Sequence, residues 1–202
     1  MPKIAIVDYG VGNLRSVKNG LERAGAETTI THSPHEIAKS DALILPGVGA
    51  FIPAVKNLQP IKREVLNLVG EGKPLLGICL GMQLLFSRSY EGGVTEGLNF
   101  FEGEIVPLPN TVKTPHMGWN ALEIVKDNLL LSGIEDGAYV YFVHSYIPKV
   151  KNTRDVVAYT DYGVSFPSVV ASGNVYATQF HPEKSSANGL RILKNFVEIV
   201  KR

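Results

Sequence analysis

The first half of the chain alternates short apolar runs with helical patterns, and this alternation restricts the folds that it can adopt. Apolar runs, several of them β-branched, predict strands at Lys3–Asp8, Glu27–Thr31, Ala42–Leu45 and Pro74–Ile78. Apolar residues at helical spacing lie between these runs: Leu14, Val17, Leu21 and Ala24, and then Ile61, Val65, Leu68 and Val69. Strands that alternate with helices predict βαβ units and a parallel sheet, with ligands at the carboxyl ends of the strands.

Local signals predict where two of the helices end or begin. Gly25 follows the first helical pattern, at the position where a glycine commonly ends a helix. The segment Ser33-Pro34-His35-Glu36 supplies an N-cap serine, a proline at the first helical position and a glutamate at the third. This is the arrangement of a capping box, so we expect a short helix to begin at Pro34.

The second half of the chain holds closely spaced strand candidates, many of them separated by Gly and Pro. These are Glu104–Leu108, Asn120–Val125, Ala138–Tyr146, Val156–Thr160, Ser168–Ser172 and Val175–Phe180. They predict antiparallel additions to the parallel sheet. The chain ends in a helical pattern with one apolar stripe, formed by Leu190, Leu193, Phe196, Val197 and Val200. No repeat, linker or charge block divides the chain, so we expect a single α/β domain over residues 1–202.

Composition argues against several classes of protein. The chain has 20 Lys and Arg residues against 19 Asp and Glu and no basic tract, so its charge does not indicate binding to nucleic acid or an anionic membrane. Its one cysteine cannot form an internal disulfide, and no Cys/His cluster predicts a metal site. With no signal-peptide or membrane-spanning pattern, we expect a soluble, cytoplasmic protein. The low charged fraction of 19% favours extra apolar surface for a partner.

The most informative segment surrounds the one cysteine, Cys79. An apolar run ends in Gly77-Ile78-Cys79-Leu80-Gly81 and a helix-compatible segment follows, which is the pattern of a nucleophile elbow with cysteine in place of serine. Such a turn projects its side chain into a cleft, and the N–H groups at the start of the following helix favour a thiolate there. A lone free cysteine in an apolar run is otherwise most simply a small core residue.

A histidine and a glutamate near the end of the chain can serve this cysteine. His181 and Glu183 follow the strand candidate Val175–Phe180, and Pro182 between them disfavours helix at His181. In an extended segment the two side chains project to the same side, so Glu183 can orient His181 as a base for Cys79. Acyl transfer also needs oxyanion donors, for which the candidates are the Leu80 N–H and the loop Pro46-Gly47-Val48-Gly49.

Together these motifs resemble the class I (triad) glutamine amidotransferases. Further segments resemble, within that family, the glutaminase subunits that serve the synthase of imidazole glycerol phosphate in histidine biosynthesis. These segments are Asp8–Leu14, Pro46–Gly49, Pro115–Asn120, Tyr141–Tyr146 and His181–Ser185. The resemblance implies the family's fold, an open and mostly parallel central sheet flanked by helices (flavodoxin-like) with antiparallel additions, and it implies no cofactor.

The resemblance also implies a reaction and a set of site residues. Cys79 would attack the side-chain carboxamide of glutamine, His181 oriented by Glu183 would pass the thiol proton to the leaving ammonia, and water would hydrolyse the thioester to glutamate. The glutamine-binding residues, carried over by position, would be Gln83, Glu91, His144, Ser145 and Tyr146.

A partner is implied as well. The ammonia would pass to a (β/α)₈-barrel synthase (cyclase) subunit that makes imidazole glycerol phosphate and an aminoimidazole carboxamide ribonucleotide. The residues that match positions near the interface of this heterodimer are Asn13, Trp119, Tyr141 and Lys184.

Three other readings of these residues remain open from the sequence. The chain could be the glutaminase of another synthase, such as the one that makes pyridoxal phosphate, although the Pro115–Asn120 segment argues against this. It could be a non-catalytic flavodoxin-like binding module in which Cys79 is a core residue. It could also be a cysteine hydrolase or peptidase on a similar scaffold, which would need no partner.

Overall fold

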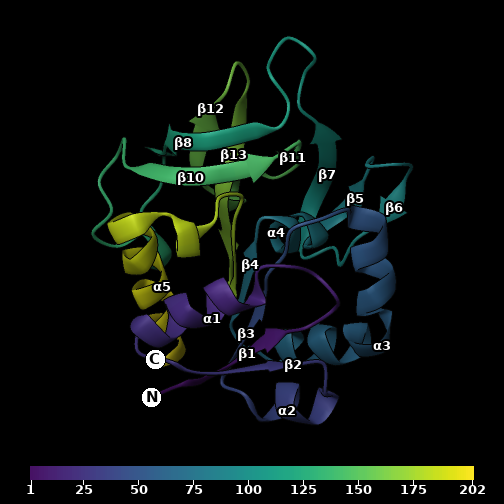
Figure 1. Cartoon of the computed structure of the whole chain (residues 1–202), viewed down its shortest axis with the longest axis vertical. Helices are drawn as coiled ribbons and strands as arrows, with labels where there is room; N and C mark the ends of the chain where they lie inside the picture. The colour runs from purple at the N-terminus through teal and green to yellow at the C-terminus, as the bar shows by residue number, and fades with distance from the viewer.

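An eight-stranded sheet with apolar strands at its centre organises the computed structural model, which describes residues 1–202 (Figure 1). Its strands are β1 (Lys3–Val7), β2 (Glu27–Thr31), β3 (Ala42–Leu45), β4 (Leu75–Ile78), β9 (Glu123–Ile124), β12 (Val156–Asp161), β13 (Ser165–Ser172) and β14 (Val175–Thr178). Their order across the sheet is β2-β1-β3-β4-β14-β13-β12-β9. The first five pair in parallel, and β13, β12 and β9 are added antiparallel beyond β14. The predicted α/β class and the parallel sheet with antiparallel additions are confirmed.

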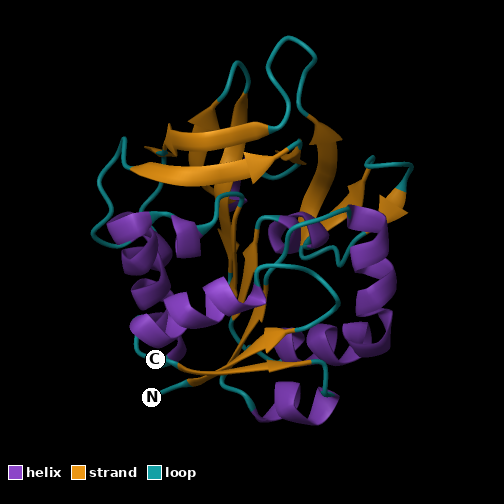
Figure 2. Ribbon diagram, viewed as in Figure 1, coloured by secondary structure: helices purple, strands orange, loops and turns teal.

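Helices cover both faces of the parallel part, which explains why its strands read as continuous apolar runs. The helices are α1 (Leu14–Arg23), α2 (Pro34–Lys39), α3 (Phe51–Gly70), α4 (Leu80–Leu84) and α5 (Ser186–Val200). Figure 2 shows α1 and α5 on one side of the sheet, with α2 and α3 on the other. Alternate residues of β3 accordingly enter two different cores: Ile44 packs toward α1 and α5, and Leu45 toward α3. No helix has the continuous apolar length that a membrane crossing requires.

The remaining strands form two smaller sheets, which the sequence patterns did not separate from the main one. One is the ribbon of β8 (His116–Ala121) and β10 (Tyr139–His144), and the other has the order β11-β7-β5-β6. The second sheet comprises β5 (Phe86–Ser89), β6 (Thr95–Glu96), β7 (Phe101–Pro107) and β11 (Tyr146–Val150). The single strand predicted for Ala138–Tyr146 is therefore wrong: the chain leaves β10 at Ser145 and enters another sheet. The single strand predicted for Asn120–Val125 is likewise two strands in different sheets, the end of β8 and the short β9.

The capping box predicted before α2 is also incorrect in its contacts. Ser33 is the N-cap and Pro34 the first helical residue, but the Ser33 side chain makes no capping hydrogen bond. Glu36 accepts a hydrogen bond from the Thr31 hydroxyl instead, and the Ser33 N–H donates to Thr31 Oγ1 at 3.0 Å. The hydroxyl of the threonine at the end of β2 thus accepts from the N-cap N–H, which is the role that a capping box assigns to the glutamate.

Close packing at Gly189 generates the first prediction. A Cβ at this position of α5 would lie 1.8 Å from the carbonyl oxygen of Pro182, so Gly189→Ala must displace either α5 or the turn of Pro182–Lys184. We expect a loss of about 1–3 kcal/mol in the free energy of unfolding, measured by urea denaturation. The matched control is Gly70→Ala, where a Cβ meets nothing within 4 Å and alanine favours the helix; a similar loss in both variants would contradict the account.

Candidate active site

The pairing of β4 with β14 brings together the two segments that carry the predicted catalytic residues. The strands are parallel neighbours with Ile78 opposite Thr178, so the residues that follow each strand emerge at the same edge of the sheet. The Cys79 N–H donates to the Thr178 carbonyl at 2.8 Å and extends this pairing by one step. Cys79 and His181 therefore lie on neighbouring strand ends, although they are far apart in the sequence.

The turn at Cys79 has the strained geometry of an elbow. Cys79 has φ 53° and ψ −105°, a combination that non-glycine residues rarely adopt, and it stands between β4 and the five-residue helix α4. A Cβ on Gly81 would lie 1.7 Å from the carbonyl oxygen of Leu45, and one on Gly77 would lie 2.9 Å from the Gly81 backbone. Both glycines are needed because the two sides of the turn and β3 pack against each other here, as the predicted elbow requires.

His181 and Glu183 form a buried pair, but their contact arises from a different backbone than the sequence predicted. His181 Nδ1 lies 2.7 Å from Glu183 Oε1, and both side chains are fully buried. His181 itself is extended, with φ −99° and ψ 97°, whereas Pro182–Lys184 forms a 3₁₀ turn. The turn brings Glu183 back to the imidazole, so the expectation that both residues lie in one extended segment is wrong while the contact is found.

The electrostatics of His181 favour the protonated ring. Burial alone would lower its pKa, but the negative charge of a Cys79 thiolate and the hydrogen bond and charge of Glu183 outweigh burial and raise the pKa from 6.5 to about 10. The other ring nitrogen, Nε2, is buried and makes no hydrogen bond. This nitrogen is therefore the one that can exchange a proton with the thiol or a substrate.

Asn13 also binds this pair. Its amide donates to Glu183 Oε1, the same oxygen that binds His181, from a left-handed backbone position (φ 74°) at the start of α1. Glu183 Oε2 is buried without a partner. The resemblance places Asn13 at a partner interface; within this chain its side chain orients the carboxylate of Glu183.

Gln179 is a residue that the sequence reasoning missed. Its side chain is buried, and its Nε2 donates to Cys79 Sγ at 3.7 Å, while the thiol lies 3.6 Å from the Val143 carbonyl. An amide donor beside the sulfur stabilises negative charge on it. The only available signal was its place between β14 and His181, since a single glutamine at a strand end has no periodicity of its own.

A cavity of about 250 Å³ opens beside Cys79 and collects the residues predicted to bind glutamine. It is lined by Val48, Gly49, Cys79, Leu80, Gln83, Glu91, Pro115, Val143, His144, Ser145 and Tyr146. All five predicted glutamine-binding residues are among them. Glu91 also accepts a hydrogen bond from the Phe51 N–H at 3.0 Å, which holds its carboxylate at the start of α3.

The predicted oxyanion donors lie at this cavity, but one of them is already engaged. The Leu80 N–H donates to the Gly47 carbonyl at 3.3 Å. The Tyr9 hydroxyl donates to the neighbouring Pro46 carbonyl, and burial together with the Cys79 charge raises the pKa of Tyr9, so this phenol stays protonated. In this conformation the loop fills the position that an oxyanion would take beside Leu80, and Val48 lines the cavity.

The predicted partner residues Trp119 and Tyr141 lie on the β8–β10 ribbon. Trp119 is half exposed, and its ring contacts that of Tyr141 edge to face, with 5.9 Å between the centroids. Met117 and Tyr139 are also exposed on these strands. Lys184 is exposed in the turn that follows His181, and the His181 N–H donates to the Tyr141 carbonyl at 2.9 Å. These side chains form an apolar surface, with one cation, close to the turn that carries His181 and Glu183.

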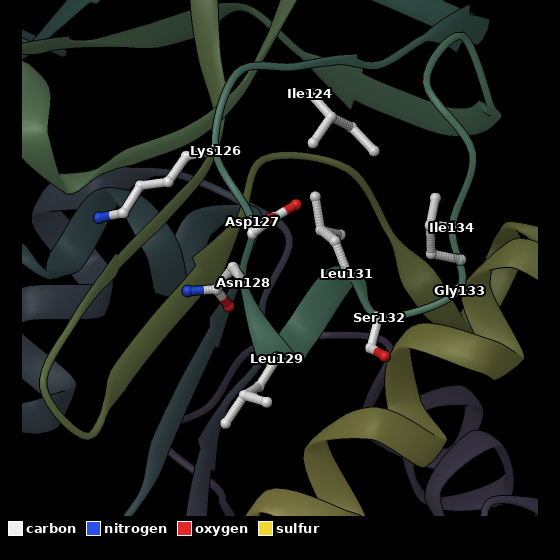
Figure 3. Close-up of a pocket in the computed structure, with 9 residues that line it drawn as sticks. All are labelled: Ile124, Lys126, Asp127, Asn128, Leu129, Leu131, Ser132, Gly133 and Ile134. Atoms are coloured by element: carbon white, nitrogen blue, oxygen red, sulfur yellow. The ribbon is translucent and has the colours of Figure 1, made fainter.

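A second cavity lacks the cysteine and histidine that line the cavity at Cys79. It measures about 470 Å³ and is lined by residues between Ile124 and Ile134, as Figure 3 shows. Its polar groups are side chains such as Lys126, Asp127 and Asn128, and it contains no cysteine or histidine. No group of three or more His, Cys, Asp or Glu residues that could hold a metal ion is found in the molecule. The cavity at Cys79 is therefore the candidate active site.

Comparison with known proteins agrees with this geometry. Residues 5–200 match the family described as glutamine amidotransferase class-I, and the chain belongs to that family. Two solved structures share the fold: PurLQS from Thermotoga maritima, with a TM-score of 0.79 and 19% identity over 98% of both chains, and a glutamine amidotransferase, with a TM-score of 0.77 and 24% identity over 98% of this chain and 99% of the other.

Curated relatives narrow the assignment within the family. The chain is 52% identical to imidazole glycerol phosphate synthase subunit HisH of Caldanaerobacter subterraneus, over 98% of both chains. It is 50% identical to the HisH subunit of Methanosarcina mazei, over 98% of this chain and all of the other, and 50% identical to that of Archaeoglobus fulgidus, over the same shares. The resemblance inferred from the motifs is confirmed.

A buried histidine pair at the site generates a prediction about pH. Burial lowers the pKa of His116 to about 4 and, together with the charges of His116 and His181, lowers that of His144 to about 3. In the unfolded chain both residues titrate near 6.5, so below this pH the unfolded state binds more protons. We expect the free energy of unfolding to fall as pH decreases from 6.5 toward 4, as measured by urea denaturation at each pH.

Carboxylates also make the free energy of unfolding depend on pH, and a comparison of variants separates the contribution of the two histidines from theirs. His116→Asn removes one of the two groups, so its free energy of unfolding should depend less steeply on pH in this range. The matched control is His35→Asn at an exposed position, which should keep the steeper dependence. Identical slopes in the wild type and His116→Asn would contradict the depressed pKa values.

Proposed function

We propose that this chain is the glutaminase subunit of an imidazole glycerol phosphate synthase, with residues 1–202 acting as one glutamine amidotransferase domain. It hydrolyses glutamine to glutamate and ammonia and delivers the ammonia to a synthase subunit. The observation that carries the proposal is the cavity at Cys79, because it joins a cysteine on an elbow to all five side chains expected to bind glutamine. The extensive identity to HisH subunits supports the choice of synthase.

The reaction follows from the groups at the cavity. Cys79 Sγ attacks the carboxamide carbon of glutamine after its proton has passed to His181 Nε2, whose ring is held by Glu183 through Nδ1. The C–N bond then breaks, and His181 gives the proton to the departing nitrogen to form ammonia. Water, deprotonated by the same nitrogen, hydrolyses the glutamyl thioester and releases glutamate. The raised pKa of His181 favours the step in which its ring holds the proton taken from the thiol.

Charge on the carbonyl oxygen must be stabilised during each addition step. The Leu80 N–H is placed directly after the nucleophile, but it binds the Gly47 carbonyl in this conformation. Rotation of the loop at Gly47 and Val48 would release the Leu80 N–H. It would also turn a backbone N–H of the loop toward the position of the oxyanion. The glycine tolerates such rotation because it has no Cβ, so the loop sets whether the site is active.

The partner that receives the ammonia is proposed to dock on the exposed face of the β8–β10 ribbon. Met117, Trp119 and Tyr139 are exposed there, and exposed aromatic side chains are typical of interface centres. The ribbon lies next to His181, because the His181 N–H donates a hydrogen bond to the carbonyl of Tyr141 on β10. A (β/α)₈-barrel synthase subunit seated on it would therefore lie close to His181, which protonates the ammonia as it leaves the substrate.

The test measures glutamate release by the chain alone, with the barrel subunit, and with the barrel subunit and its nucleotide ligand. We expect release to rise when the partner is present, and Cys79→Ala to lower it on the order of 10⁴-fold or more, since the nucleophile is lost. The control is that Cys79→Ala still folds and still binds the partner. An absence of glutaminase activity under every condition, or undiminished turnover by the variant, would contradict the proposal.

A further inference from the structure

The two faces of the β8–β10 ribbon have different roles. Met117 and Trp119 of β8 project outward and are exposed, whereas His116 and Asn120, on the alternate positions, project to the other side. On that side His116 pairs in register with His144 at the end of β10. His116 and His144 are both buried; His144 lines the cavity, whereas His116 has no role in the reaction described above.

These inner residues form a continuous chain of hydrogen bonds. His116 Nδ1 lies 2.9 Å from His144 Nε2, and His144 Nδ1 lies 3.0 Å from the Tyr146 carbonyl oxygen. At the other end, Asn120 Nδ2 lies 3.4 Å from His116 Nε2 and donates to the Asp161 carbonyl at 2.8 Å. The chain thus runs from one backbone carbonyl to another through two imidazole rings.

The position of every proton in this chain can be deduced. Burial keeps both rings neutral at physiological pH, so each ring has one donor and one acceptor. A carbonyl only accepts, so His144 donates from Nδ1 to Tyr146, and its Nε2 must accept from His116 Nδ1. His116 Nε2 then accepts from Asn120, whose orientation is fixed independently because its Oδ1 accepts from the Ala121 N–H at 2.8 Å.

The His116 ring is also held mechanically. It is stacked between Tyr162, with 3.9 Å between the centroids and 19° between the planes, and Phe142, at 4.8 Å and 20°. The Tyr162 hydroxyl donates to the Lys113 carbonyl at 3.0 Å, which holds that ring in turn. A ring held on both faces cannot rotate to offer His144 its other nitrogen.

The far end of the chain is part of the cavity. The Tyr146 carbonyl that accepts from His144 also accepts from Gln83 Nε2 at 3.1 Å, and all three residues line the cavity. We propose that His116 is a positioning residue for glutamine: it imposes the Nδ1–H tautomer on His144 and thereby holds the His144 ring, the Tyr146 carbonyl and the Gln83 amide in the arrangement that binds the substrate. This inference rests on the proposed function for the identity of the ligand.

The tautomer can be read without any activity measurement. In the ¹⁵N spectrum of the histidine rings of the wild-type chain, we expect Nδ1 to be protonated and Nε2 unprotonated on both His116 and His144 at neutral pH. A protonated Nε2 on His144 would overturn the proposal. Because this result is independent of turnover, it stands even if the chain proves to have no glutaminase activity, in which case the proposed function fails and the tautomer assignment does not.

Two variants separate positioning from simple packing. In His116→Asn the Nδ2 amide is attached to Cγ, as Nδ1 is, so the donor to His144 is kept; in His116→Gln the amide lies one atom further out, and that donor is lost. Both remove the stacked ring. We measure glutamine binding in the Cys79→Ala background by calorimetry, where substrate is not consumed.

We expect His116→Gln to weaken glutamine binding by about five- to tenfold, the effect of losing one hydrogen bond, and His116→Asn to stay within about twofold of the parent. The His144 ring should keep its Nδ1 proton in His116→Asn only. Equal losses in the two variants, or no loss in His116→Gln, would overturn the proposal. Should His116→Gln fail to fold, the wild-type tautomer and the His116→Asn affinity still decide it.

Discussion

The parallel pairing of β4 with β14 is the interaction on which the site depends. Because Ile78 and Thr178 are opposite each other, Cys79 and the Gln179–Glu183 segment emerge at one edge of the sheet. The fit is tight: the backbone turn at Cys79 leaves no room for a Cβ at Gly81, which packs against the Leu45 carbonyl. A shift of one residue in this pairing would move Cys79 to the opposite face of the sheet and separate it from His181.

Three histidines at or near the cavity show how burial and charge give the same side chain different protonation states. Burial acts against the charged form of each histidine, and it prevails at His116 and His144, whose pKa values are lowered. At His181 a carboxylate and a thiolate outweigh burial, and the pKa is raised. The structure therefore favours the protonated ring at His181, whereas His116 and His144 are neutral links in a hydrogen-bond chain.

Much of this arrangement could be predicted from the sequence, and the failures have physical causes. The apolar runs and the glycines around Cys79 predicted the parallel strands and the elbow because both follow from local patterns. The break at Ser145 was not predicted, since a strand that changes sheets keeps its alternation on both sides. The Glu36 contact with Thr31 and the Gln179 contact with Cys79 were missed because each depends on a neighbour that the backbone supplies only after folding.

The conformation of the predicted oxyanion loop could not be inferred from the sequence either. The glycine at position 47 permits two orientations, and only the structure shows that its carbonyl binds the Leu80 N–H. The same loop is held by Tyr9, a contact for which no sequence pattern exists. The conformation of this loop thus depends on tertiary contacts, whereas the cysteine, histidine and glutamate of the candidate site are visible in the sequence motifs.

The central claim is that strand pairing makes Cys79 the nucleophile of a glutaminase. The most direct measurement is to mix the chain and the proposed barrel partner with isotopically labelled glutamine, quench with acid during turnover, and locate the label by peptide mass spectrometry. The account predicts a glutamyl group on the peptide that contains Cys79 and on no other. Glutamate production with a glutamyl group at a different residue, or with none on Cys79 in a quench that preserves thioesters, would contradict it.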